Sequence, residues 1–137
     1  MWISAPIAAI CTAAAFAGPA SAHAGQAETV VTKFDQAIPN IPGKSLIAVE
    51  VDYAPGVASP SHTHAKSAFI FAYVLSGEIE SKVNDGETRI YKAGESWSET
   101  PGARHQVSRN PSKTEPARLL AVFVVDTGDK PLTTPVK

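Results

Sequence analysis

Short runs of β-branched and aromatic residues alternate with turn residues along most of this chain. Glycine, proline and Asn-Asp clusters recur about every eight to twelve residues, and no segment has the period of an amphipathic helix. The 11 prolines fall mainly between the runs, where they interrupt no strand ladder. The pattern predicts a single all-β domain, a sandwich or barrel. The predicted strands are residues 29–34, 46–53, 69–75, 78–83, 88–91, 95–99, 105–109 and 119–125.

Turn chemistry separates several of these strands. Asn84-Asp85-Gly86 is a strong hairpin signal because all three residue types tolerate a positive φ, and Ser76-Gly77 and Ala93-Gly94 mark two more reversals. After the last predicted strand, residues 127–137 contain two prolines and three threonines. This segment is expected to form an extended or loosely ordered C-terminal arm.

The first part of the chain differs in kind from the rest. Residues 2–17 are nearly all apolar or small, and every Lys, Arg, Asp and Glu follows Ala27. A Gly18-Pro19 break and two small-x-small sequences around Ala22 are typical of a cleavage site, so residues 1–24 are predicted to be a cleaved export signal. The mature protein would then be periplasmic or secreted. An uncleaved anchor or a buried helix is the alternative, because no Lys or Arg precedes the apolar run.

Composition limits what the mature chain can bind. Residues 25–126 have the size of one small domain, and the only cysteine, Cys11, lies in the predicted signal, so disulfides and thiolate chemistry are excluded. The 12 basic and 13 acidic residues are scattered without runs, which predicts no nucleic-acid partner and, after signal cleavage, no membrane association. A small-molecule or metal role is favoured.

Three of the four histidines form a ligand pattern. His62 and His64 are two residues apart, so in an extended strand both side chains point to the same face. A Pro-Gly turn about forty residues later precedes His105, and a barrel could bring it beside the pair. The three imidazoles are predicted to bind one metal ion. The alternative is that His62 and His64 are surface loop residues, since Ser59-Pro60-Ser61 precedes them.

Two motifs in this region resemble the signatures of the cupin superfamily. The first is Gly56, five residues, His62-x-His64 and a strand that ends at Gly77-Glu78. The second is Gly94, the Thr100-Pro101-Gly102 turn and His105, with Thr100 where the family usually has proline. The resemblance covers about Gly56 to Asn110. It implies a jelly-roll β-barrel whose mouth holds one divalent metal bound by inward-facing histidines.

One ligand of the family pattern is missing. Cupins usually add a glutamate four or five residues after the second histidine, and this chain has Phe69 or Ile70 there. Glu99 is a possible substitute: it shares a strand face with Trp97, so an inward indole would bring the carboxylate inward too. Glu99 is therefore a candidate fourth ligand, partner of a ligand histidine or general base. It could equally be an ordinary solvated glutamate.

Other candidates have weaker signals. Arg104 and Arg109 could receive a substrate carboxylate near the barrel mouth, but arginines that flank a strand are commonly solvated. Aromatic residues of the predicted strands could contribute to a pocket or simply to the core; these are Tyr53, Phe71, Tyr73 and Trp97. His23 is assigned to the export region.

Three imidazoles do not decide which metal is bound. Fe, Ni, Mn, Cu and Zn all accept nitrogen ligands, and a three-histidine face leaves coordination positions open. The favoured function is a dioxygenase-like metal enzyme for a small oxygen-chelating substrate. The alternatives are an isomerase or lyase that uses the metal as a Lewis acid, a non-catalytic metal or small-ligand binding protein, and a partner-recognition barrel. Residues 119–125 are apolar on both faces, which predicts a homodimer.

Overall fold

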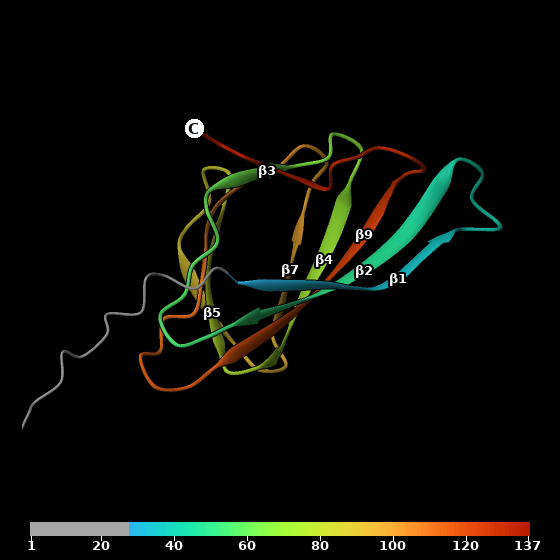
Figure 1. Cartoon of the computed structure of the whole chain (residues 1–137). Helices are drawn as coiled ribbons and strands as arrows, with labels where there is room; N and C mark the ends of the chain where they lie inside the picture. The colour runs from blue at the N-terminus through green and yellow to red at the C-terminus, as the bar shows by residue number, and fades with distance from the viewer. Residues whose placement is uncertain (1–27) are drawn as a thin grey trace, which may run out of the picture.

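Two antiparallel sheets face each other and enclose the core. The computed structural model describes residues 28–137, so the predicted export signal lies outside the described residues. One sheet has the order β1-β2-β9-β4-β7 and the other β10-β3-β8-β5-β6 (Figure 1). The strands are β1 (Thr29–Ala37), β2 (Lys44–Tyr53), β3 (His62–His64), β4 (Phe69–Ser76), β5 (Glu78–Val83), β6 (Arg89–Lys92), β7 (Ser96–Glu99), β8 (Arg104–Arg109), β9 (Ala117–Asp126) and β10 (Thr133–Pro135).

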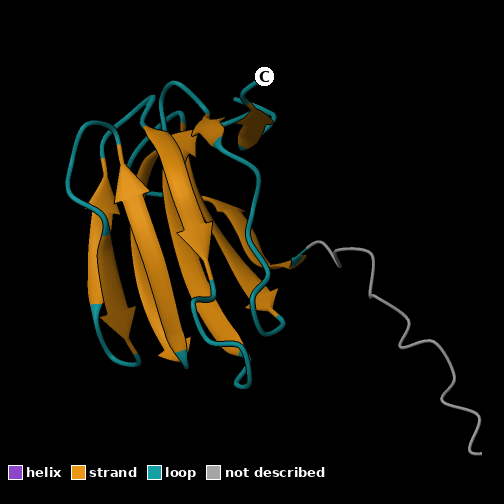
Figure 2. Ribbon diagram, turned by 90° about the vertical axis from the view of Figure 1, so that its left-hand side faces the viewer, coloured by secondary structure: helices purple, strands orange, loops and turns teal. Residues whose placement is uncertain are grey.

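Strict alternation of side chains builds the core. In β2 every second residue from Ser45 to Tyr53 is buried, and β9 pairs with β2 along its whole length, from Lys44 opposite Asp126 to Tyr53 opposite Ala117. Because successive strand residues point to opposite faces, the inward rows of both strands meet the second sheet. Figure 2 shows the two layers from the side. The all-β jelly-roll prediction is confirmed.

The eight predicted strands are present, with ends that differ by a few residues, and two further strands were not predicted. β3 and β10 have three residues each, too few to show alternation in the sequence. They pair with each other, with Thr133 opposite His64 and Pro135 opposite His62. Part of the predicted C-terminal arm is therefore extended and belongs to a sheet.

The predicted turns connect strands in two different ways. Asn84, at φ 49°, lies in the hairpin between β5 and β6. The turns at Gly77 and Gly94 instead carry the chain from one sheet to the other, since β4 and β7 belong to the first sheet and β5 and β6 to the second. Between residues 28 and 137 the structure has no helix that is long and apolar enough to cross a membrane.

Gly77 and Gly43 offer a matched test of the crossover between the sheets. Both have a positive φ, but a Cβ on Gly77 would lie 2.4 Å from the Pro116 carbonyl oxygen, whereas a Cβ on Gly43 would meet nothing within 4 Å. Gly43→Ala should cost about 1 kcal/mol of backbone strain, and Gly77→Ala roughly 3 kcal/mol or more, because the contact is with backbone. Urea unfolding measures both. Equal losses would contradict a steric requirement at Gly77.

Candidate metal centre

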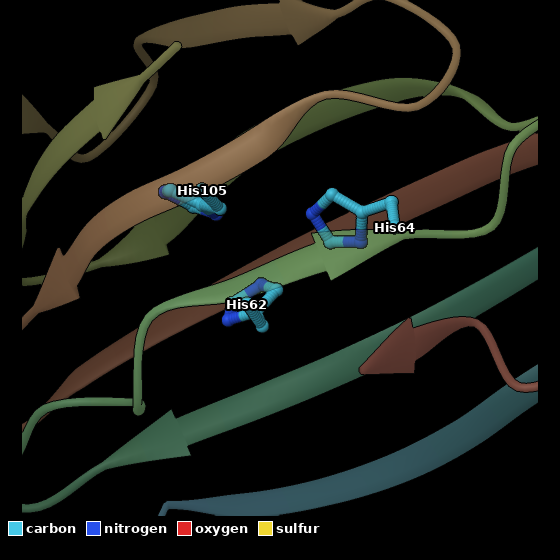
Figure 3. A group of neighbouring side chains, drawn as sticks. All are labelled: His62, His64 and His105. Atoms are coloured by element: carbon cyan, nitrogen blue, oxygen red, sulfur yellow. The ribbon is translucent and has the colours of Figure 1, made fainter. Parts of the chain in front are cut away.

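Strand pairing brings the three predicted histidines together. His62 and His64 extend from β3, and His62 lies directly opposite His105 on β8. The ring centroid of His62 lies 4.8 Å from that of His64 and 5.2 Å from that of His105. One ring nitrogen of each residue lies within 4.8 Å of the other two (Figure 3). The cluster therefore has the ligand types and the spacing to hold one metal ion after small side-chain movements.

Backbone carbonyls determine how two of the rings are protonated. His62 Nδ1 lies 2.8 Å from the Pro60 carbonyl oxygen, and His64 Nδ1 lies 3.3 Å from that of Leu132. A carbonyl oxygen only accepts hydrogen bonds, so each Nδ1 carries the proton and donates. This leaves Nε2 of each ring as the atom that could bind a metal, an arrangement typical of metal-binding histidines.

Burial keeps His62 and His105 uncharged. Burial lowers the pKa of His105 to about 4, although the nearby Glu99 carboxylate acts in the opposite direction. Burial also lowers the pKa of His62, despite its hydrogen bond to Pro60. His105 Nε2 lies 2.8 Å from Ser81 Oγ, and its Nδ1 lies 3.3 Å from Glu99 Oε1. Both residues are therefore in the neutral form that binds metals.

Glu99 is buried beside two of the histidines. Its exposure is 2%, and the Trp97 indole Nε1–H donates to Oε1 at 3.1 Å. Burial alone would raise the pKa of Glu99, but the His64 and His105 imidazoles outweigh it and lower the pKa below its usual value. The carboxylate is thus ionised, and a buried ionised carboxylate requires a positive partner.

The contact between Glu99 and His64 indicates where a positive partner of the Glu99 carboxylate would lie. Glu99 Oε2 lies 2.9 Å from His64 Nε2, and neither buried atom has another hydrogen-bond partner within the described part of the chain. With Nδ1 protonated, a neutral His64 would direct a lone pair at a carboxylate lone pair. Either a second proton on His64 or a metal ion beside both atoms removes this repulsion. The residues present therefore fit a divalent cation.

Register explains how Glu99 reaches the site. Ile70 and Phe69 occupy the positions where the family resemblance implies a glutamate; Ile70 is 1% exposed and Phe69 is 46% exposed. Glu99 lies directly opposite Ile70 on the neighbouring strand β7. Cross-strand partners lie side by side on the same face of a sheet. The carboxylate that the family pattern places on β4 is therefore supplied by Glu99 of the neighbouring strand β7.

A cavity of about 360 Å³ adjoins the histidines and Glu99. Tyr53 contributes to its wall. Phe71 is exposed, Tyr73 half-buried and Trp97 buried, and all three lie outside the lining. Arg104 and Arg109 are exposed and outside the cavity lining, and Arg109 pairs with Glu80. Three serines that the sequence did not single out also surround the site: Ser59, Ser81 and Ser108.

Comparison with known proteins agrees with this architecture. A Cupin domain profile matches residues 49–123. A germin-like protein of Arabidopsis thaliana, subfamily 2 member 2, is 34% identical over a match that covers 63% of this chain and 41% of that protein. The chain spans only 41% and 43% of the lengths of the curated relatives that it matches.

Solved structures share the fold. The DMSP lyase DddQ from Ruegeria pomeroyi superimposes with a TM-score of 0.64 at 19% identity, covering 80% of this chain and 52% of that one. Oxalate oxidase in complex with glycolate superimposes with a TM-score of 0.59 at 24% identity, covering 80% and 55%. With two facing sheets, a three-histidine cluster and a profile match over more than half of its residues, the chain belongs to the cupin superfamily.

Proposed function

We propose that this chain binds one divalent transition metal through His62, His64 and His105 and acts as a mononuclear metal enzyme on a small oxygen-chelating substrate. The observation that carries the proposal is the buried pair of His64 Nε2 and Glu99 Oε2, 2.9 Å apart and with no other hydrogen-bond partner in the described part of the chain, at the edge of a cavity. A protein that only stored metal would gain nothing from an adjoining cavity of ligand size, so the cavity favours an enzyme. The likeness to oxalate oxidase and DMSP lyase supports the fold alone.

Glu99 has the position of a general base in this proposal. Trp97 holds Oε1, which leaves Oε2 directed toward His64 and able to take the proton of a chelating hydroxyl group. Apolar residues of β2, β4 and β9 surround the site and exclude water, which strengthens the electrostatic contacts. A bound metal would polarise two substrate oxygens as a Lewis acid and, if redox-active, allow oxidation by dioxygen. An isomerase or lyase would need the same base and metal without the oxidant.

Elemental analysis of untagged protein tests the metal site. We expect one transition metal per chain, whose identity the same measurement supplies. His62→Ala, His64→Ala and His105→Ala should each abolish stoichiometric metal, because two remaining imidazoles no longer enclose an ion. Thr63→Ala is the matched control, since its side chain lies on the opposite face of β3. Full metal content in any of the three histidine variants would contradict the site.

Glu99→Gln, measured for metal affinity by titration and for turnover of a chelating substrate, separates the roles of the carboxylate. The change preserves shape and removes charge, and we expect metal affinity to fall about 10–100-fold. The exposed Glu87→Gln is the control. Unchanged metal affinity with lost turnover would restrict Glu99 to proton transfer. Unchanged affinity and unchanged turnover would remove Glu99 from the site.

We also propose that the protein is a homodimer that buries the outer face of the β1-β2-β9-β4-β7 sheet. One row across this face runs from Phe71 through Val122 and Ala48 to Phe34. Phe71 is 43% and Phe34 47% exposed. A contiguous exposed apolar face of this kind is typical of a protein interface, and β9, apolar on both sides, lies at its centre.

Phe71→Glu should convert the dimer to a monomer, because it places a charge in the apolar row, at the end that Phe71 forms. Ile90→Glu is the control: Ile90 is similarly exposed, at 49%, but lies on β6 of the other sheet. Sedimentation velocity distinguishes the species. A wild-type monomer at micromolar concentration and above would contradict the proposal.

We propose, finally, that the segment before residue 25 directs export to the periplasm or beyond. The apolar run of residues 2–17 and the small-x-small sequences around Ala22 support this assignment. The intact mass of the exported protein should correspond to a chain that begins near Gly25. A recovered chain that retains Met1 would contradict cleavage.

A further inference from the structure

The charge of the cavity lining restricts what the cavity can bind. The described lining includes two carboxylates, Glu28 and Glu99, and no Lys or Arg. Residues 1–27 contain no Lys or Arg either. An anionic group on a ligand, beyond the atoms that contact the metal, would therefore meet no side-chain cation and would lie near two negative charges.

The wall of the cavity is mostly apolar. Its side chains come from β2, β4 and β9 and include Val49, Val51, Ile70, Ala72, Leu119 and Phe123. Transfer of an ionised carboxylate from water to such surroundings is costly unless it is paired and hydrogen-bonded. An uncharged, largely apolar body gains from the same transfer.

One polar group of the wall can hold a ligand oxygen. Tyr53 Oη lies 2.8 Å from both Ser59 Oγ and Ser108 Oγ, and all three residues line the cavity. These three hydroxyls, which we call the hydroxyl cluster, have three protons but form two mutual hydrogen bonds. One proton therefore remains for an acceptor in the cavity.

A β-bulge places the hydroxyl cluster on the same side as the histidines. Ser108 is three residues after His105, a separation that would put the two on opposite faces of a regular strand. The pairing of β5 with β8 skips Gln106, so His105 and Ser108 are both buried and both line the cavity.

We propose that the cavity takes an uncharged small molecule with an apolar body, one of whose oxygens accepts a hydrogen bond from the hydroxyl cluster. The proposal rests on the proposed metal enzyme and specifies its substrate class: neutral carbonyl or hydroxycarbonyl compounds, as opposed to compounds with additional carboxylates. At about 360 Å³ the cavity has room for a molecule of one or two rings.

A pair of probes with nearly the same shape tests the preference for neutral ligands. Para-acetylbenzamide and para-acetylbenzoate share a carbonyl acceptor and an aromatic body and differ in one charge. Ligand-detected NMR titration of the full chain should show the amide binding at least about tenfold more tightly. Equal or tighter binding of the carboxylate, including binding through a metal, would overturn the proposal. Failure of both probes to bind at millimolar concentration would also overturn it.

Two lysine variants test whether the lack of a cation in the cavity causes the preference for neutral ligands. Val30 lines the cavity and is 58% exposed on the edge strand β1, so Val30→Lys can add the missing cation without disturbing the core. Affinity for the carboxylate should rise several-fold, and affinity for the amide should stay within about twofold. Ile90→Lys, with the same added charge on the other sheet, should change neither. An unchanged preference in Val30→Lys would show that the missing cation is not its cause.

The transition-metal content of the same samples distinguishes the proposed metal enzyme from the inferred ligand class. Loss of the probe preference with full metal content would reject the inferred ligand class and leave the metal site intact. A metal-free sample that still prefers the amide would reject the metal enzyme and retain the ligand class.

Discussion

A negative charge buried in an apolar barrel is the constraint on which this site depends. Glu99 is 2% exposed and ionised, and its neighbours are two imidazoles and one indole N–H. The indole satisfies one carboxylate oxygen and leaves the other beside His64. A buried charge of this kind needs a positive or hydrogen-bonding partner next to it, so the same carboxylate explains why two imidazoles and an indole N–H surround it and why a cation would be favoured beside it.

Short strands carry the residues of this site: β3 carries His62 and His64, and β7 carries Glu99. β3 has only three residues, but it lies between β8 and β10, and its two histidines are thereby fixed relative to His105. β2 and β9 pair over ten residues each and form the rigid opposite wall. Sites built on such strands are positioned more accurately than sites on loops.

Much of this arrangement could be predicted from the sequence. Alternation and turn residues predicted eight strands, and the spacing of His62, His64 and His105 predicted that they meet. The inward direction of Glu99 followed from the large indole two residues before it. The strands and the direction of Glu99 depend on local geometry, which a sequence pattern records, whereas the approach of His105 followed from the resemblance to the cupin signatures.

Features that depend on strand register could not be predicted. The sequence does not show that Glu99 lies opposite Ile70, or that the bulge at Gln106 brings Ser108 to the side of His105. It also does not separate Arg109, which pairs with Glu80 outside the cavity, from an arginine that could bind a substrate. β3 and β10 were missed because three residues show no periodicity.

The pairing of β10 with β3 has a consequence for when the site forms during synthesis. The carbonyl of Leu132 orients the His64 ring, and Thr133–Pro135 form the outer edge of the strand that carries two histidines. Residues 28–131 can therefore leave the ribosome and pair their other strands while the site is still incomplete. The three histidines therefore come together only after translation has passed residue 135.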